Sequence, residues 1–393
     1  MSLPVITSSA ITRPEHELLL CCVRTRSNSE IVDRLRTLAR VVSDWEYLFL
    51  LARRHAVVPL LYIQLRQHAS DLVPGEFLVQ LKQRYQENAA RNLVFTAELC
   101  RLIDLFAKAG VEAIPYKGPT LSLLAYNDLA LRRFVDLDII VRKKDVCPAR
   151  DLLLSEGYEL AKSLGPSQQQ VLLRTQHNIQ FTRDNRRLIV ELHWEVASHL
   201  FASSVQADDL WRNLKTVRVN GRTLKTLSAD DLLFSLCVHG SRHLWERLAW
   251  ICDVAELISR LKVDWPSLFD RAAKTDSERM FLLGLYLAES LFGPVLPADV
   301  RQQCAADKRI LELAGNVVAH LFNGAVPIPA TSGEIFRYNV GVRSSWRARA
   351  RYFAYMLRPT DADLEARALP RNWEFAYYLM RPFRLFFKPG ANG

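Results

Sequence analysis

The chain has 393 residues, of which 49% are apolar and 24% are charged. This balance excludes a disordered or fibrous protein, and the length is sufficient for two or three domains with a sizeable core. The formal net charge of +10 is compatible with anionic ligands such as nucleotides, nucleic acid or membrane surfaces, but the basic residues are spread along the chain.

The cysteines and the N-terminal residues indicate the cellular setting. Seven cysteines form no CxxC pair and no regular framework, which favours a reduced environment. The apolar run LLLCCV is far shorter than the roughly 20 residues of a membrane span, and the N-terminus lacks the charged start of a signal peptide. We therefore expect a soluble, cytoplasmic protein.

The apolar pattern divides the chain into three regions. Residues 1–108 and 228–393 show the three- and four-residue spacing of packed helices, and Ser228 ahead of Asp231 indicates a helix start. Residues 109–227 alternate strand and helix patterns. A short strand, a helix begun near Pro119, a strand over 134–141, a helix closed by Gly157 and a hairpin with its turn at Asp184-Asn185 are predicted there. The fold class is therefore α+β, with a mixed sheet between two mainly helical regions.

The strand predicted in FVDLDIIV carries two carboxylates. Asp136 and Asp138 are two apart, so their side chains lie on one face, opposite Leu137, Ile139 and Val141. Neighbouring like charges repel each other and are costly to desolvate unless a cation neutralises them. Oxygen ligands of this kind suit Mg²⁺ or Mn²⁺. The alternative is an exposed strand edge at which the pair binds nearby arginines.

Two further motifs favour the metal site over that alternative. Lys117 and Gly118 stand at a predicted strand-to-helix junction, where backbone N–H groups and the lysine charge suit phosphate. In LIVELHWEV, Glu191 is a third acid on a later strand. Three carboxylates of this kind can hold metal ions that align an attacking oxygen and a triphosphate.

These motifs, taken in order, resemble the nucleotidyltransferase superfamily related to DNA polymerase β, which has a glycine turn, an Asp-x-Asp strand and a later carboxylate. More narrowly, YKGPTLSLLAYND, LRRFVDLDIIV, SEGYEL, VELHWEV and HGSRHLWERLAWICDVAEL resemble uncharacterised bacterial nucleotidyltransferase-like proteins. The resemblance covers roughly residues 90 to 300. It implies that Asp136, Asp138 and Glu191 are catalytic metal ligands, that Gly118 is the turn glycine and that residues 109–227 form the catalytic core.

Further candidate residues lie around these motifs. Arg132 could reach the phosphates or form a surface salt bridge, and His193, on the face of Glu191, could orient substrate, bind metal or be structural. His239 and His243 share one face of a predicted helix and, with Arg247 and Asp253, could build an acceptor or nucleotide pocket. The alternatives are a polar packing seam and, less favoured, a zinc site at the two histidines. Trp245 and Trp250 are expected in a core or interface. The helical spacing of Arg343, Arg347 and Arg351 is typical of a solvated face.

Two functions remain open at this point. The first is a Mg²⁺- or Mn²⁺-dependent enzyme that moves a nucleoside monophosphate from an NTP such as ATP to a hydroxyl-type acceptor and releases pyrophosphate. The acceptor could be a small molecule, a peptide, a protein or RNA. The second is an inactive nucleotide-binding or regulatory module on the same fold, because Lys117-Gly118, followed by Pro119, replaces the superfamily's usual Gly-Ser pair. A nucleic-acid polymerase is a third option, but no aromatic and basic module supports it.

Overall fold

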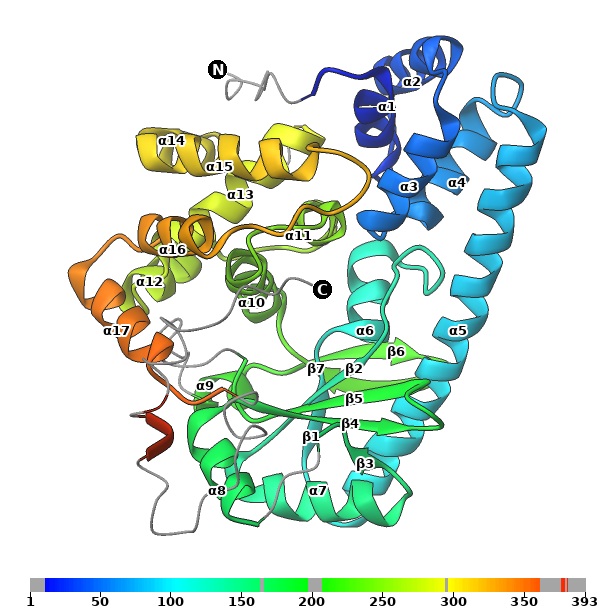
Figure 1. Ribbon diagram of the computed structural model, residues 1–393. Helices are drawn as coiled ribbons and strands as arrows, with labels where there is room; N and C mark the ends of the chain where they lie inside the picture. Colours follow the sequence, from blue (N-terminus) through cyan, green and yellow to red (C-terminus); the bar gives the residue numbers. More distant parts are fainter. Residues whose placement is uncertain are drawn as a thin grey trace.

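The protein combines a mixed β-sheet with a large helical part, as the sequence predicts. The computed structural model describes residues 11–162, 166–196, 207–293, 296–360, 376–378 and 380. Helices from both ends of the chain lie above a five-stranded sheet in the view of Figure 1. Within the described residues, no helix is both long enough and apolar enough to cross a membrane.

Five helices form the N-terminal part, and they confirm the helical pattern of this region. They are α1 (Pro14–Cys22), α2 (Ser29–Val41), α3 (Trp45–Arg54), α4 (Val58–His68) and α5 (Gly75–Lys108). The long helix α5 links the two layers of the molecule (Figure 1). Phe77 near its start packs in the core of the N-terminal helices, whereas Phe95 and Phe106 pack against the sheet.

The sheet is built from strands in the order β1-β2-β5-β4-β3, with β2 and β5 parallel and the other pairs antiparallel. The strands are β1 (Ala113–Pro115), β2 (Leu137–Val141), β3 (Glu159–Leu160), β4 (Asn178–Arg183) and β5 (Leu188–His193). Between and after them lie α6 (Gly118–Leu121), the π-helical turn η1 (Ser122–Tyr126), the 3-10 turn η2 (Lys143–Asp145), α7 (Val146–Ser155), α8 (Pro166–Thr175), α9 (Ala207–Arg212) and the hairpin β6 (Lys215–Val219) and β7 (Arg222–Thr226).

The two faces of β2 have different surroundings. Leu137, Ile139 and Val141 pack in the core that α5 and α7 form on one face of the sheet. Asp138 and Ile140 lie on the opposite face, and Ile140 packs in the core of the helical part. The predicted alternation is therefore confirmed. It brings the acidic face of the strand toward the helices from the two ends of the chain.

The strand prediction for 134–141 was three residues too long, because β2 begins at Leu137. A strand needs a neighbour for its backbone hydrogen bonds, and β5 pairs with β2 only from Leu137 onward. On the other side, β1 ends at Pro115, and the chain turns away at Gly118, whose φ is +52°. The hairpin prediction is confirmed, with positive φ at Asp184 and Asn185 in the turn between β4 and β5.

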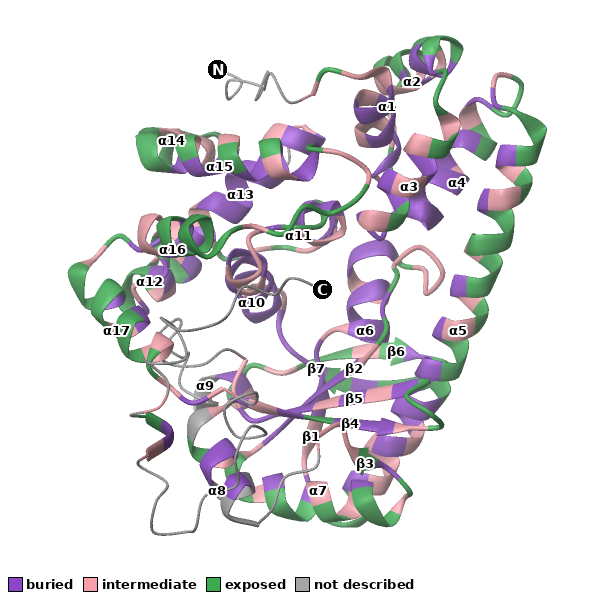
Figure 2. Cartoon of the chain, in the orientation of Figure 1, coloured by how far each residue is buried: buried purple, intermediate pink, exposed green. Residues whose placement is uncertain are grey.

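The described residues after Ser228 are mainly helical, and Ser228 caps the first of these helices by accepting the backbone N–H of Asp231 (3.1 Å). Figure 2 shows α10 and α13 buried along most of their length, whereas α14 and α17 are largely exposed. The helices are α10 (Ala229–Arg242), α11 (Leu248–Arg260), α12 (Trp265–Lys274), α13 (Glu278–Phe292), α14 (Ala298–Ala306), α15 (Lys308–Leu321), α16 (Ser332–Gly341) and α17 (Trp346–Met356).

The predicted solvated face of arginines was wrong for Arg343. Arg343 lies between α16 and α17, where helical spacing does not apply, and it is fully buried. Its guanidinium lies 4.2 Å from the ring centre of Tyr352 and donates to Asn339 Oδ1 (3.1 Å). Burial lowers the pKa of Arg343 to about 10. Arg347 is exposed, as predicted, and Arg351 binds Asp276 (2.9 Å).

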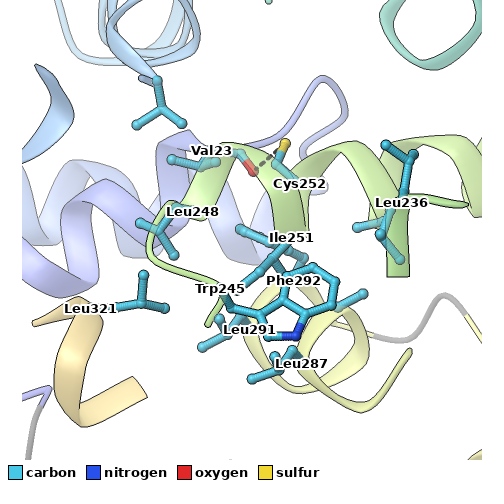
Figure 3. Packing of buried hydrophobic residues seen from close by; sticks show 14 of the residues in the cluster. Val23, Leu236, Trp245, Leu248, Ile251, Cys252, Leu287, Leu291, Phe292 and Leu321 are labelled. Carbon is cyan, nitrogen blue, oxygen red and sulfur yellow. Dashed lines mark hydrogen bonds between the residues drawn. The ribbon is translucent and has the colours of Figure 1, made fainter. Parts of the chain in front are cut away.

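Trp245 lies at the centre of the core that the two helical parts share. Its ring is fully buried, and Figure 3 shows it among Leu248, Ile251 and Leu287. In the same cluster, the Cys252 thiol donates to the carbonyl of Val23, so α11 contacts the chain just after α1. The expectation that Trp245 belongs to a core is confirmed.

His55 makes the stability of this shared core depend on pH. Its Nε2 donates to the carbonyl of Leu321 (3.0 Å) and its Nδ1 accepts the N–H of Leu248 (3.3 Å), which only the neutral ring can do. Burial, with the nearby Arg54 charge, lowers the pKa of His55 to about 3. The unfolded chain takes up this proton near pH 6.5 and the folded chain does not, so stability falls as the pH drops from about 6.5 toward 3.

We therefore expect His55→Gln to flatten the acid side of the stability profile. The amide can still donate to Leu321 and accept from Leu248, but it does not titrate. Urea unfolding between pH 7 and 5 measures the effect, and the wild type should lose up to about 1.4 kcal/mol more per pH unit than the variant. Equal slopes for the two proteins would contradict the assigned role of His55.

Candidate functional site

The acidic face of the sheet brings three potential metal ligands together. Because β2 and β5 are parallel and in register, Asp138 lies beside Glu191 on the same face, and His193 follows two residues later. Among the described residues, these three side chains form a group whose donor atoms all lie within 4.8 Å of one another. His193 Nε2 is 3.1 Å from Asp138 Oδ1 and 3.3 Å from Glu191 Oε2.

Lys117 and Gly118 stand directly beside this group. The N–H of Tyr116 donates to the carbonyl of Asp138 (3.4 Å), which extends the pairing of β1 with β2 and places Lys117 next to the acidic face. Lys117 Nζ donates to Asp138 Oδ1 (3.3 Å). A Cβ atom added to Gly118 would contact the backbone oxygen of Asp136 at 3.5 Å, in addition to being strained at positive φ. The turn therefore lies close against the segment that precedes β2.

The charges of the group are strongly coupled. Burial would raise the pKa of Asp138, but the Lys117 ammonium and the hydrogen bond from His193 hold it well below its usual range. Burial also opposes the charge on Lys117 and His193, and in both cases the neighbouring carboxylates outweigh it and raise the pKa. In the structure, the Lys117 ammonium is thus a positive charge beside the buried carboxylate, and His193 forms a hydrogen bond with it.

Asp136 lies at the edge of the group, because it precedes the strand. Its carboxyl group is not among the three donors within 4.8 Å of one another. It is nevertheless electrostatically coupled to them. Burial, and then the charges of Asp138 and Glu191, raise the pKa of Asp136 to about 7. The site thus holds more carboxylates than its own cations fully neutralise, which is the condition that a bound divalent cation relieves.

The hairpin supplies a contact that the sequence reasoning missed. Asn178 on β4 is paired with His193 on β5, and its Nδ2 donates to Glu191 Oε2 (3.0 Å). The preceding residue, His177, contacts Arg242 of α10 through its Nε2 (2.7 Å). The register of the predicted hairpin was the signal that could have identified Asn178. No pattern in the sequence indicates the contact of His177 with Arg242 of α10.

Arg132 is held by a buried ion pair. Its Nε lies 3.0 Å from both carboxylate oxygens of Asp253 on α11, and Tyr126 also donates to Asp253 (2.8 Å). The alternative of a surface salt bridge was therefore wrong, because the partner lies within the helical part and is 1% exposed. Arg132 Nη1 is buried and has no hydrogen-bond partner among the described residues. It remains a donor that a phosphate oxygen could use.

His239 of α10 and His243, the residue that directly follows this helix, form a cluster beside Lys117. The ring centres of His239 and His243 are 4.6 Å apart, and both rings contact Trp250. Lys117 Nζ lies 3.5 Å from His239 Nδ1. Burial and the Lys117 charge lower the pKa of His239, so the ring is neutral and can accept this contact. Arg247 is exposed, 5.6 Å from the ring centre of Trp250.

The donor set fits a divalent cation. Two carboxylates and one imidazole from adjacent strands converge on one point, with Asp136 nearby. Oxygen donors suit Mg²⁺ and Mn²⁺, and the imidazole nitrogen adds a donor that Mg²⁺ seldom uses. The predicted residues on three different segments, 117–118, 136–138 and 191–193, are thus brought together, while Arg132 is engaged with α11.

Comparison with known families agrees with this arrangement. No curated protein matches the chain significantly. The family described as uncharacterised nucleotidyltransferase matches residues 42–293, more than half of the chain, including every element that contributes to the site. The family description implies transfer of nucleotidyl groups, with an NTP as substrate. The chain therefore belongs to the uncharacterised nucleotidyltransferase family.

Proposed function

We propose that the protein is a metal-dependent nucleotidyltransferase that moves a nucleoside monophosphate from an NTP to a hydroxyl-type acceptor. The acceptor oxygen bonds to the α-phosphorus, the bond from that phosphorus to the β-phosphate oxygen breaks, and pyrophosphate leaves with the electron pair. One observation supports this above all. Asp138, Glu191 and His193 converge beside Lys117, in a chain that belongs to the uncharacterised nucleotidyltransferase family.

The proposed ligands of the divalent cation are Asp136, Asp138 and Glu191, with His193 as a fourth donor. The cation, Mg²⁺ or Mn²⁺, would offset the charge of the carboxylates and of the triphosphate. The imidazole favours Mn²⁺ over Mg²⁺, because Mg²⁺ prefers oxygen ligands. Asn178 holds the Glu191 carboxylate in place through its hydrogen bond (3.0 Å). Glu191 is also the proposed acceptor of the proton that leaves the acceptor hydroxyl.

Lys117 and Gly118 are the proposed phosphate-binding residues. The Lys117 ammonium already lies beside Asp138 and is charged, so it can hold a phosphate oxygen without a change in its protonation. Arg132, through its free Nη1, is a further proposed phosphate contact. We propose that residues 109–227 form the nucleotidyltransferase-like core and that residues 228–393 contribute His239, His243 and Arg247 to a substrate pocket, while residues 1–108 support it.

The alternative is a nucleotide-binding module without turnover. One contact favours it, because Lys117 neutralises Asp138 within the protein itself (3.3 Å). The presence of Glu191 and His193 in the same group favours the enzyme, since a site that only holds an anion has no chemical need for them.

Calorimetry with an NTP and Mg²⁺ or Mn²⁺ tests the assignment of the site. We expect an Asp136→Ala, Asp138→Ala double variant to lose metal-dependent NTP binding, because its strongest oxygen donors are gone. Circular dichroism should show whether the variant folds. His193→Ala is a milder change, and it should weaken the binding of Mn²⁺ more than the binding of Mg²⁺. NTP binding of wild-type affinity in the folded double variant would contradict the assignment.

A further inference from the structure

A second basic site lies at the start of the segment that leads to the metal ligands. A cavity of about 660 Å³ is lined by five arginines, Arg53, Arg54, Arg84, Arg91 and Arg133, and by one carboxylate, Glu87. We call it the arginine pocket. Its wall is formed by α3, the start of α4, α5, the segment before β2, and residues 325–327.

The charges of the arginine pocket are not balanced by acidic residues. Glu87 is engaged by Arg84 (2.9 Å), and no other arginine of the pocket forms an ion pair with a described residue. Within the described residues, Arg91 donates to Asn88 (2.7 Å), and Arg54 donates to Asn323 and to backbone carbonyls. The cavity is therefore lined by more basic than acidic side chains.

Several donors in this pocket remain unused. The Nε atoms of Arg54 and Arg91 are buried and have no hydrogen-bond partner among the described residues. The Arg53 guanidinium lies 5.6 Å from the ring centre of Phe49. Within the described residues, the side chains of Arg53 and Arg133 form no hydrogen bond or ion pair. Desolvation and the charges of Arg247 and Arg53 lower the pKa of Arg133. Guanidinium groups gathered at one place repel one another unless an anion compensates their charges.

The arginine pocket lies beside the segment that leads to the candidate metal site. Arg133 precedes Asp136 by three residues, so their Cα atoms lie within roughly 10 Å of each other. Asn88, which lines the pocket, donates to the carbonyl of Ala130 (2.8 Å) and so fixes this segment to α5. On the other side, Arg247 lies near Arg133 and against Trp250, which contacts His239 beside Lys117.

We propose that the arginine pocket binds a compact, phosphate-bearing molecule, which on the function proposed above is the acceptor of the nucleotidyl group. The volume lies in the range of small-molecule sites, and guanidinium groups match phosphate oxygens in pairs. Its lining contains no aromatic side chain among the described residues, whereas sites for single-stranded nucleic acid stack bases on aromatic rings. A small phosphorylated ligand therefore fits the pocket better than an RNA strand does.

Calorimetry with inorganic tripolyphosphate in EDTA tests the proposal on the full chain. Arg53→Gln with Arg133→Gln removes two exposed arginines of the pocket, and Arg40→Gln with Arg347→Gln removes two exposed arginines elsewhere. We expect the pocket variant to weaken binding about tenfold or more and the matched control to bind like the wild type. Thermal unfolding of both variants shows whether they fold equally well.

Three results would overturn the proposal: no binding by the wild type, equal binding by the pocket variant, or equal weakening in the control. If a single-stranded oligonucleotide bound the same pocket more tightly than tripolyphosphate, the proposal that the ligand is a compact molecule would be wrong. The assay contains neither NTP nor divalent metal, so its outcome does not require the metal ligands of the proposed reaction. Failure of the proposed reaction would appear only in the NTP measurements, and the two failures are therefore distinguishable.

Discussion

Replacing Asp138 by Asn is expected to reduce metal-dependent nucleotidyl transfer by about 1,000-fold or more. Asparagine has the same shape but lacks the charge that binds a cation, and a catalytic cation contributes several kcal/mol to transition-state stabilisation. The change also removes the carboxylate that Lys117 and His193 contact. The rate of label transfer from an α-labelled NTP measures the effect.

Two controls separate loss of chemistry from loss of structure. Glu112→Gln removes a carboxylate that binds Lys225 and Arg142 away from the site, and it should leave the rate within about twofold. Glu191→Gln changes a half-buried residue that we propose as a metal ligand, and it should cause a loss similar to that of Asp138→Asn while disturbing the fold less. A folded Asp138→Asn protein with near wild-type transfer would show that this carboxylate is not part of the reaction.

Adding one methyl group at Gly240 is expected to destabilise the protein by about 2–3 kcal/mol or more. Gly240 lies on α10 directly against the buried Trp245 ring, and a Cβ atom there would approach the ring carbon Cζ3 to 2.3 Å. Neither group can move freely, because Trp245 is fully buried in the shared core. The free energy of unfolding of Gly240→Ala in urea measures the cost.

A glycine-to-alanine substitution in α15 is the matched control, and its effect on the free energy of unfolding is expected to have the opposite sign. Gly315 lies in a helix, and a Cβ atom added there would have no neighbour within 4 Å. Alanine has the higher helix propensity, so Gly315→Ala should stabilise the protein by about 0.5–1 kcal/mol. If both variants were stabilised, the close approach of α10 to Trp245 would be incorrect.

The local parts of the site could be predicted from the sequence. The alternation of Asp136 and Asp138 with apolar residues places the two carboxylates on one face of the strand. The turn after β1 requires a residue with positive φ, and Gly118 adopts it. The hairpin turn at Asp184-Asn185 fixes the pairing of β4 with β5. The contact of Asn178 with Glu191 could therefore also have been predicted from the sequence. These features depend on short-range geometry, which the order of residues specifies.

The β6–β7 hairpin was missed although its signal is strong. Asn220-Gly221 is a typical two-residue hairpin turn, and it joins strands that alternate polar and apolar residues. Thr226 at the end of β7 donates to the carbonyl of Pro115 (2.7 Å). This contact supports β1 next to the site, so the missed hairpin contributes to the position of Lys117.

The contacts between distant segments could not be predicted in the same way. Arg132 binds Asp253 across 121 residues, and His55 joins Leu248 to Leu321. Arg343 is buried because α16 and α17 close around it, not because of its spacing to Arg347. Such partners depend on how the helices from the two ends pack together, and no local pattern specifies that packing.

Label transfer from NTP tests the central claim most directly. The protein is incubated with a cell extract and an NTP labelled on either the α- or the γ-phosphate, with Mg²⁺ or Mn²⁺ or with EDTA. We predict that α-label enters an acceptor only with metal, that γ-label does not, and that Asp138→Asn abolishes the transfer. Metal-independent transfer, transfer of γ-label alone, or no transfer of α-label by the wild type would contradict the assignment of the protein as an active nucleotidyltransferase.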